Sequence, residues 1–335
     1  MSGRFAVTAL RSFIAAVLSV AFACTAGAQN AKTDPVAAYP SKPIRWIVPF
    51  TPGGSNDLIG RLIAGKMTQA WGQQVVIDNR GGAGGLIGAE TVAHAAPDGY
   101  TLILSNPGPS VNAPLLAKRP SYRMEDFAPV LWIGYTPLIL VTNINFPPRN
   151  PKELVDYAKA NPNKVSWGSS GIASSLHIGL ALLQAATQIP VAHVPYKGTA
   201  PALTDVVGGQ IQGMHTTVLS AEGQMKGNRV RVIGIASSKR AAILPDVPTL
   251  AEHGIKDAEA LVWFGMGAPA KTPRAIIDKL NREVNRILTL PDVKSRFTEL
   301  GLEIQGGTPE AMDAFMSNEV AKIRRLITAG LLKAE

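Results

Sequence analysis

Glycine and small polar residues gather in one turn whose composition suits the binding of an anion. The turn reads Phe50-Thr51-Pro52-Gly53-Gly54-Ser55-Asn56-Asp57. Gly53 and Gly54 let the backbone approach a ligand closely, and a helix that begins near Asn56 directs unpaired N–H groups and its positive dipole end at the same place. One exposed helix end contributes only about 0.3–1 kcal/mol, so a tight site needs more than this turn. The alternative is an ordinary turn in which Ser55, Asn56 or Asp57 is the N-cap.

A second turn of this kind, Gly168-Ser169-Ser170-Gly171, precedes another expected helix. Two helix ends that face each other across a cleft hold the two carboxylates of a diacid through backbone N–H groups and serine hydroxyls. The alternative is a serine-capped helix start that binds no ligand. Arg80 and Lys197 stand beside further glycine-rich turns, where they either add positive charge to the site or are solvated surface residues.

Two glycine-containing segments approach nucleotide-binding motifs but lack required residues. Residues 60–67 have the spacing of a phosphate-binding loop, yet Met67 replaces the Ser or Thr that binds magnesium, and the apolar period places the segment inside a helix. Residues 82–87 begin like a dinucleotide fingerprint, but Ile87 occupies its last small-residue position. We therefore expect no nucleotide and no other cofactor.

Catalytic and metal-binding patterns are also missing from the sequence. No G-x-S-x-G occurs, and the only cysteine is Cys24. The histidines are His94, His177, His193, His215 and His253, and they show no metal-ligand spacing. We expect a binding protein with no catalytic residue and no metal. The alternative is a hydrolase or isomerase that uses His177 or His215, either of which is placed to reach a cleft, as its base.

The first 28 residues are typical of a secretory signal peptide. Arg4 and Arg11 precede an apolar run at residues 13–23 that is too short to span a bilayer, and Ala26-Gly27-Ala28 has the form of a cleavage site. We predict cleavage after Ala28, a polar spacer at residues 29–38 and a periplasmic mature protein. A retained membrane anchor is the alternative, and a lipid anchor on Cys24 is disfavoured by Ala21, where a residue such as Leu is expected.

Length and composition favour a globular protein of about two domains. The chain has 335 residues, of which 46% are hydrophobic and 17% charged, values that exclude a disordered or coiled-coil chain. The formal net charge is +9, but the basic residues are scattered. We therefore expect no nucleic-acid partner.

Short apolar runs alternate with amphipathic segments along most of the chain, the pattern of parallel strands joined by helices. Strands are expected at 44–50, 74–78, 100–105, 138–143, 165–167, 191–196 and 229–236. Helices are expected at 57–71, 86–95, 151–160 and 201–207, and one more follows the turn at 168–171 and ends at about 186. After 263–269 the pattern becomes helix only, at 273–288, 292–300 and 309–326. The expectation is an α/β protein of two similar lobes: lobe 1 at 39–138 and 255–335, and lobe 2 at 139–254.

An ordered set of motifs resembles one family, the extracytoplasmic receptors of tripartite tricarboxylate transporters (TctC or Bug type). The matching segments are 39–44, 48–57, 78–85, 97–102, 194–202 and 244–249. The resemblance implies a type II periplasmic-binding-protein fold, in which crossing strands join two α/β lobes around a ligand cleft. It also implies a small carboxylate ligand, a di- or tricarboxylate or an aromatic acid, that a monomeric receptor delivers to transporter membrane subunits. A sensor that presents the ligand to a signalling partner is the alternative.

The resemblance implies that the turn at 52–57 holds the ligand carboxylate. With His177 and His215, the expected ligand-binding set is Phe50, Pro52, Gly53, Gly54, Ser55, Asn56, Asp57, Ala83, Gly84, Ser105, Asn106, Ser169, Ser170, His177, Tyr196, Lys197, Gly198, Thr199, His215 and Thr216. Where relatives commonly read Met-Phe-Asp, this chain reads Met214-His215-Thr216. A carboxylate that would pair with a ligand ammonium is then missing, so we predict a ligand without an amino group.

Overall fold

The computed structural model describes residues 36 and 38–332. The predicted signal peptide, its cleavage site and nearly all of the predicted spacer lie outside the described residues. Pro40–Glu335 form one compact unit, and everything below concerns this unit. Within the described residues, none of the helices combines the length and the apolar character that a membrane span requires.

One sheet has six strands in the order β11-β4-β10-β3-β1-β2. Its strands are β1 (Ile44–Val48), β2 (Val75–Asn79), β3 (Thr101–Ser105), β4 (Phe127–Pro137), β10 (Leu261–Pro269) and β11 (Glu303–Ile304). The helices attached to it are α2 (Ser55–Trp71), α3 (Leu86–Ala93), α4 (Ala113–Leu116), α9 (Arg274–Leu288), α10 (Pro291–Glu299) and α11 (Pro309–Thr328). We call this part lobe 1. β1 is parallel to β2 and β3, as the strand–turn–helix pattern predicted.

The second sheet has five strands in the order β7-β6-β8-β5-β9. Its strands are β5 (Ile139–Asn143), β6 (Ser166–Ser169), β7 (Ala192–Pro195), β8 (Gly213–Thr216) and β9 (Val230–Ile235). Its helices are α5 (Pro151–Ala160), α6 (Ser175–Thr187), α7 (Thr199–Val207) and α8 (Val218–Lys226). We call this part lobe 2. The residue limits of the two lobes stay a prediction, since Pro40–Glu335 form one unit.

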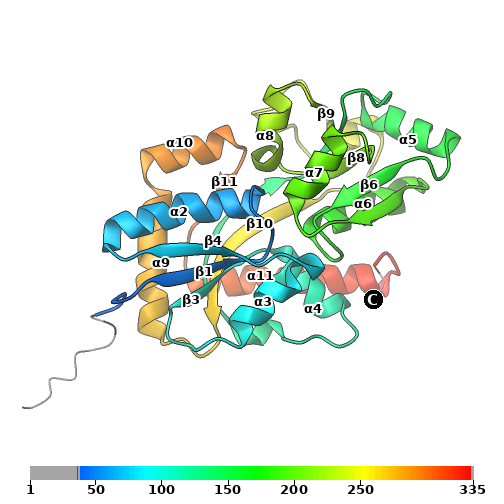
Figure 1. The fold of residues 1–335 in the computed structure, drawn as a ribbon. Helices are drawn as coiled ribbons and strands as arrows, with labels where there is room; N and C mark the ends of the chain where they lie inside the picture. The colour runs from blue at the N-terminus through cyan, green and yellow to red at the C-terminus, as the bar shows by residue number, and fades with distance from the viewer. Residues whose placement is uncertain (1–35, 37, 333–335) are drawn as a thin grey trace, which may run out of the picture. The chain divides into compact units, whose positions relative to one another are not determined.

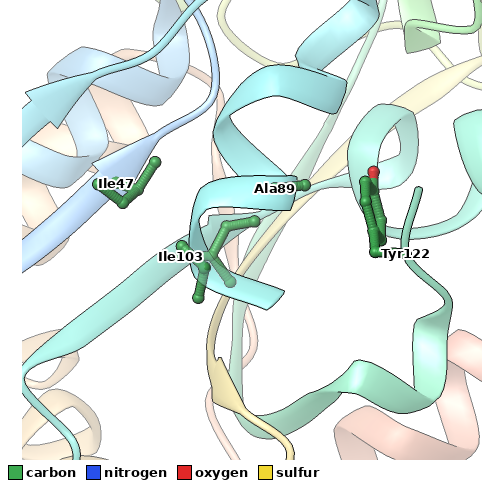
Figure 2. Packing of buried hydrophobic residues seen from close by; sticks show 5 residues of the cluster. Ile47, Ala89, Ile103 and Tyr122 are labelled. Atoms are coloured by element: carbon green, nitrogen blue, oxygen red, sulfur yellow. The ribbon is translucent and has the colours of Figure 1, made fainter. Parts of the chain in front are cut away.

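Apolar spacing explains how the helices attach to the sheets. On lobe 1, Ala89 and Val92 of α3 pack on Ile47 of β1 and Ile103 of β3, and Tyr122 closes the cluster (Figure 2).

On lobe 2, α5 begins where the sequence predicted: Asn150 is the N-cap, its Oδ1 accepts the N–H of Glu153 at 3.0 Å, and proline occupies the first helical position.

The chain crosses between the lobes twice, at the junction of β4 with β5 and at the start of β10 (Figure 1). Leu138 lies in the first crossing, and its N–H donates to the carbonyl of Ala260 in the second at 2.9 Å. The carbonyl of Leu138 accepts the N–H of Ala236 at 2.8 Å. The two crossings therefore run side by side, as expected for lobes joined by crossing strands.

The structure also corrects the predicted elements. The C-terminal part is not helix only, because β11 adds Glu303–Ile304 to the edge of β4; two residues are too few for a sequence period. β4 was not predicted, since Pro129 and Pro137 break the strand signal. β8 and α8 were not predicted either. Three short 3-10 segments, η1 (Ala83–Gly85), η3 (Met124–Asp126) and η4 (Ala251–His253), and one π-helical turn, η2 (Gly108–Asn112), complete the described elements.

Candidate functional site

A small cavity lies where the two lobes meet. Its volume is about 10 Å³, which leaves room for about one water molecule. It is lined by Phe50, Ser55, Asn56, Asn106, Ser170, Ser175, Leu176, Thr199, Thr217, Ser220 and Val262. All the polar lining groups are hydroxyls or amides, so no charged side chain faces this cavity.

The polar lining residues stand mainly at the first turns of helices. Ser55 opens α2, Ser175 opens α6, Thr199 opens α7, and Thr217 is the N-cap of α8. The first turn of a helix leaves backbone N–H groups without partners inside the helix and carries the positive end of its dipole. Four such ends around one cavity make it a favourable place for an anion.

The turn before α2 differs from the simple capping alternative. Gly54 is the N-cap and makes no side-chain cap bond, and Gly53 has φ +86°, a conformation that favours glycine. Asp57 reaches back instead, and its Oδ2 accepts the N–H of Gly53 at 3.0 Å. Burial alone would raise the pKa of Asp57, but the Arg61 guanidinium at 2.9 Å and the Gly53 N–H together hold that pKa below its usual range. Asp57 therefore shapes the turn as a charged residue.

Asn56 and Asn106 form the amide pair of the cavity. The Nδ2 of Asn106 donates to the Oδ1 of Asn56 at 2.6 Å, and the Oδ1 of Asn106 accepts the N–H of Gly108 at 3.1 Å. Both side chains are buried. Because the acceptor atoms of both amides are already occupied, the Nδ2 group of Asn56 is left to donate.

The serine turn of lobe 2 does not itself begin a helix, which corrects the predicted serine-capped start at this turn. α6 starts at Ser175, and its N-cap is Ser174, whose Oγ accepts the N–H of His177 at 3.3 Å. The Oγ of Ser169 lies 2.6 Å from the Nε2 of His193 and accepts the N–H of Gly171 at 3.1 Å. Ser170 lines the cavity and Ser169 does not.

Three histidines of lobe 2, His177, His193 and His215, do not line the cavity. The ring of His177 stacks on that of His193, with 4.1 Å between centroids, and its Nδ1 accepts the N–H of Ala173 at 3.1 Å. Burial and the nearby His177 lower the pKa of His193 to about 4. His215 is fully buried, its Nδ1 accepts the indole N–H of Trp167 at 3.0 Å, and burial lowers its pKa to about 3. His193 and His215 are therefore neutral at pH 7.

Glycines bring the rims of the two lobes into backbone contact. A side chain at Gly84 of η1 would overlap the carbonyl oxygen of Ile172 in lobe 2, and a side chain at Gly198 would overlap the hydroxyl of Thr51 in lobe 1. Ala83 and Lys197 are exposed beside these contacts. Loops expected at the ligand thus contact the opposite lobe at Gly84 and at Gly198.

Two further predicted residues are engaged elsewhere. The hydroxyl of Tyr196 donates to Asp205 at 2.6 Å, and burial together with this carboxylate raises the pKa of Tyr196 to about 12. Arg80 forms an ion pair with Asp78 at 3.1 Å. Among the described residues, His, Cys, Asp and Glu do not gather in groups of three or more that could hold a metal ion.

The structure brings part of the predicted set together at the cavity. The predicted residues that line it are Phe50, Ser55, Asn56, Asn106, Ser170 and Thr199. Those that do not are Pro52, Gly53, Gly54, Asp57, Ala83, Gly84, Ser105, Ser169, His177, Tyr196, Lys197, Gly198, His215 and Thr216. The roles of all of these in ligand binding stay predictions.

Sequence reasoning missed five lining residues: Ser175, Leu176, Thr217, Ser220 and Val262. A local signal existed for Thr217 alone, because threonine is a preferred N-cap residue and its Oγ1 accepts the N–H of Ser220 at the start of α8. Val262 belongs to the crossing strand β10, and no local pattern predicts that it reaches the cavity.

The chain is similar to known proteins over most of its length. The family described as "Tripartite tricarboxylate transporter family receptor" matches residues 59–332. A Pseudomonas sp. (strain P51) protein, "UPF0065 protein in tcbD-tcbE intergenic region", is 38% identical over 316 residues, which are 94% of each chain. Protein BugT of Bordetella pertussis is 36% identical over 292 residues, covering 86% of this chain and 90% of BugT.

Solved structures share both the fold and part of the sequence. Periplasmic binding protein BugD has a TM-score of 0.84 at 36% identity, covering 88% of this chain and 100% of BugD. Rpa4515 of R. palustris, solved with adipate, has a TM-score of 0.84 at 33% identity, covering 87% of this chain and 98% of Rpa4515. MatC (Rpa3494) from Rhodopseudomonas palustris, solved with bound malate, has a TM-score of 0.82 at 33% identity, covering 86% of this chain and 100% of MatC. The predicted two-lobed periplasmic-binding fold is confirmed.

Proposed function

The chain belongs to the tripartite tricarboxylate transporter receptor family, and we propose that it captures a small carboxylate without an amino group and delivers it to the membrane subunits of such a transporter. The observation that carries the proposal is the cavity between the lobes, where four helix N-termini and neutral side chains meet. The predicted signal peptide supports a periplasmic location, and we propose that the receptor acts there as a monomer.

Neutral donors suit a carboxylate because each bond gains from the ligand's charge while no charged side chain lines the cavity. Hydrogen bonds to charged groups contribute about 1.5–3 kcal/mol each. The amide of Asn56, the hydroxyl of Ser170 and the first-turn N–H groups are such donors. Similar proteins of known structure hold malate and adipate, which supports a carboxylate ligand.

The same lining argues against an ammonium group on the ligand. No Asp or Glu lines the cavity, and Asp57 is engaged by Arg61 and Gly53. A buried ammonium without a carboxylate partner is strongly unfavourable. Amino acids are therefore expected to bind far more weakly than hydroxy acids or simple diacids of the same size.

Capture requires the lobes to move. The cavity has room for about one water molecule, so a dicarboxylate reaches the site only when the lobes separate. The lobes then close on it, and the contacts that both make to the ligand favour the closed form. The transporter subunits read that closed form.

The lining also favours a receptor over a hydrolase or isomerase. The two candidate bases do not line the cavity: His215 is fully buried, and the ring of His177 stacks on that of His193. Because no titratable side chain lines the cavity, a general base is missing from its lining.

A thermal-shift screen of the mature protein against carboxylic acids, amino acids and neutral sugars tests the proposal. A ligand present at 100 times its dissociation constant adds about 2.7 kcal/mol to the free energy of unfolding, a shift of several degrees. We expect such shifts from carboxylates alone. A shift produced by a neutral solute, with none from any carboxylate, would contradict the proposal.

A further inference from the structure

Helix α8 of lobe 2 contacts lobe 1 at two points. The Oγ of Ser220 accepts the N–H of Ser55, in the first turn of α2, at 2.9 Å. The carboxylate of Glu222 binds the guanidinium of Arg296 on α10 through two bonds, from Nη2 to Oε2 at 2.8 Å and from Nη1 to Oε1 at 3.3 Å. Figure 1 shows α8 beside α10 at the edge of the two lobes.

We infer that the Glu222–Arg296 ion pair positions the two lobes, sets the balance between the open and closed cleft, and so tunes ligand affinity without touching the ligand. The inference deepens the proposed function and rests on it for the ligand. Among the ion pairs of the described residues, this one alone joins lobe 1 to lobe 2.

The pair is coupled to the cavity through one short helix. Ser220 lines the cavity, and Glu222 lies two residues further along α8. A movement of α8 that separates Ser220 from Ser55 therefore also separates Glu222 from Arg296. Closure makes both contacts at once, and opening breaks both.

Each partner of the pair also has a second partner on its own lobe. Lys226 binds Glu222 at 2.8 Å within α8, and Glu299 lies 3.5 Å from Arg296 within α10. Opening therefore leaves neither charge without a partner, which avoids the penalty of an unpaired charge. This arrangement makes the contact reversible, as a receptor that must release its ligand requires.

The exposure of the two side chains sets the size of the effect. The side chain of Glu222 is 22% exposed and that of Arg296 is 43% exposed, so solvent screens their attraction. Exposed pairs of this kind change an equilibrium by about two- to fivefold. Because apparent affinity scales with the closed fraction, the dissociation constant should change by about the same factor.

The test compares Arg296→Gln and Glu222→Gln with a matched control, Lys226→Gln, which removes a partner of Glu222 that does not cross between the lobes. Spin labels on Lys159→Cys of α5 and Arg282→Cys of α9, both exposed, report the distance between the lobes. The labelled mature protein, residues 29–335, which contains no native cysteine, is measured without ligand and with malate. Malate affinity is measured in parallel.

We expect Arg296→Gln and Glu222→Gln to lengthen the distances between the labels and to weaken malate binding by about two- to fivefold, while Lys226→Gln leaves both near wild type. Distances that are unchanged in Arg296→Gln in both conditions, or that lengthen as much in Lys226→Gln, would overturn the inference. The distances need no ligand, so a failure of malate to bind affects the proposed function alone.

Discussion

Asn106 donates its Nδ2 hydrogen to the Oδ1 of Asn56 at 2.6 Å, and this single bond orients the amide of Asn56. Asn106 is itself fixed by the N–H of Gly108 at 3.1 Å. The pair thus keeps a donor, rather than an acceptor, available at the α2 end of the cavity. The proposed carboxylate ligand would accept a hydrogen bond from this donor.

Replacing Asn56 should weaken carboxylate binding strongly. Asn56→Ala removes a bond to a charged group, about 1.5–3 kcal/mol or roughly ten- to a hundredfold in dissociation constant. Asn56→Asp should weaken it further, because a second negative charge faces the ligand. Calorimetric titration with malate measures both, and equal affinities for wild type and Asn56→Asp would contradict the role given to this amide.

Two helix caps allow binding to be separated from stability. Thr217 caps α8 and lines the cavity, while Thr308 caps α11 away from it; each Oγ1 accepts a backbone N–H at 3.2 Å. Thr217→Ala and Thr308→Ala should each lower the free energy of unfolding by about 1 kcal/mol. Urea unfolding with malate titration checks that only Thr217→Ala also loses affinity. A similar affinity loss in Thr308→Ala would mean that the effect is global.

The glycine contact at the rim should be needed for closure. Gly84→Ala places a methyl group against the carbonyl of Ile172 at a residue with φ +64°, so the lobes can no longer close fully. Gly65→Ala is the matched control, since it lies inside α2 with open space around it and should stabilise the protein by about 0.5–1 kcal/mol. We expect malate affinity to fall at least tenfold in Gly84→Ala and to stay unchanged in Gly65→Ala. Small-angle scattering with malate should show Gly84→Ala remaining open, and a closed profile would refute this account.

Acid should destabilise the protein through the half-buried His193. The pKa of His193 is lowered to about 4 by burial and by His177, so the unfolded chain takes up a proton below about pH 6.5 while the folded chain does not. Above pH 6.5, His193 is neutral in both states and does not lower the free energy of unfolding. As pH falls from 6.5 toward 4, only the unfolded chain takes up the proton, so the free energy of unfolding falls. Urea unfolding at several pH values should show a shallower loss for His193→Gln than for wild type. His94→Gln, at an exposed position, serves as the control and should follow wild type.

Local sequence signals predicted the parts of the fold that depend on neighbouring residues. Asn150 followed by proline marked the start of α5, and the apolar run into Gly53 and Gly54 marked the step from β1 to α2. β4 escaped prediction because two prolines interrupt it, and it is held by its long antiparallel pairing with β10. Pairing between distant segments leaves no local period to detect.

The residues of the site likewise divide into those that local sequence predicted and those that depend on contacts between distant segments. Asn56 and Ser170 were predicted and line the cavity, but Ser169, in the same turn as Ser170, is turned toward His193. Which of two adjacent serines faces a cleft depends on strand register, and a strand one residue out of register exchanges its faces. Val262 reaches the cavity only because β10 crosses between the lobes, which is a property of the whole fold.

Calorimetric titration with malate and aspartate tests the proposed ligand class, because the two ligands differ only in a hydroxyl or an ammonium on the same carbon. The neutral cavity predicts that malate, or the diacid found in the thermal-shift screen, binds at least a hundredfold more tightly than its amino counterpart, about 2.7 kcal/mol. Aspartate binding as tightly as malate would contradict the account, because the cavity lining offers an ammonium group no carboxylate.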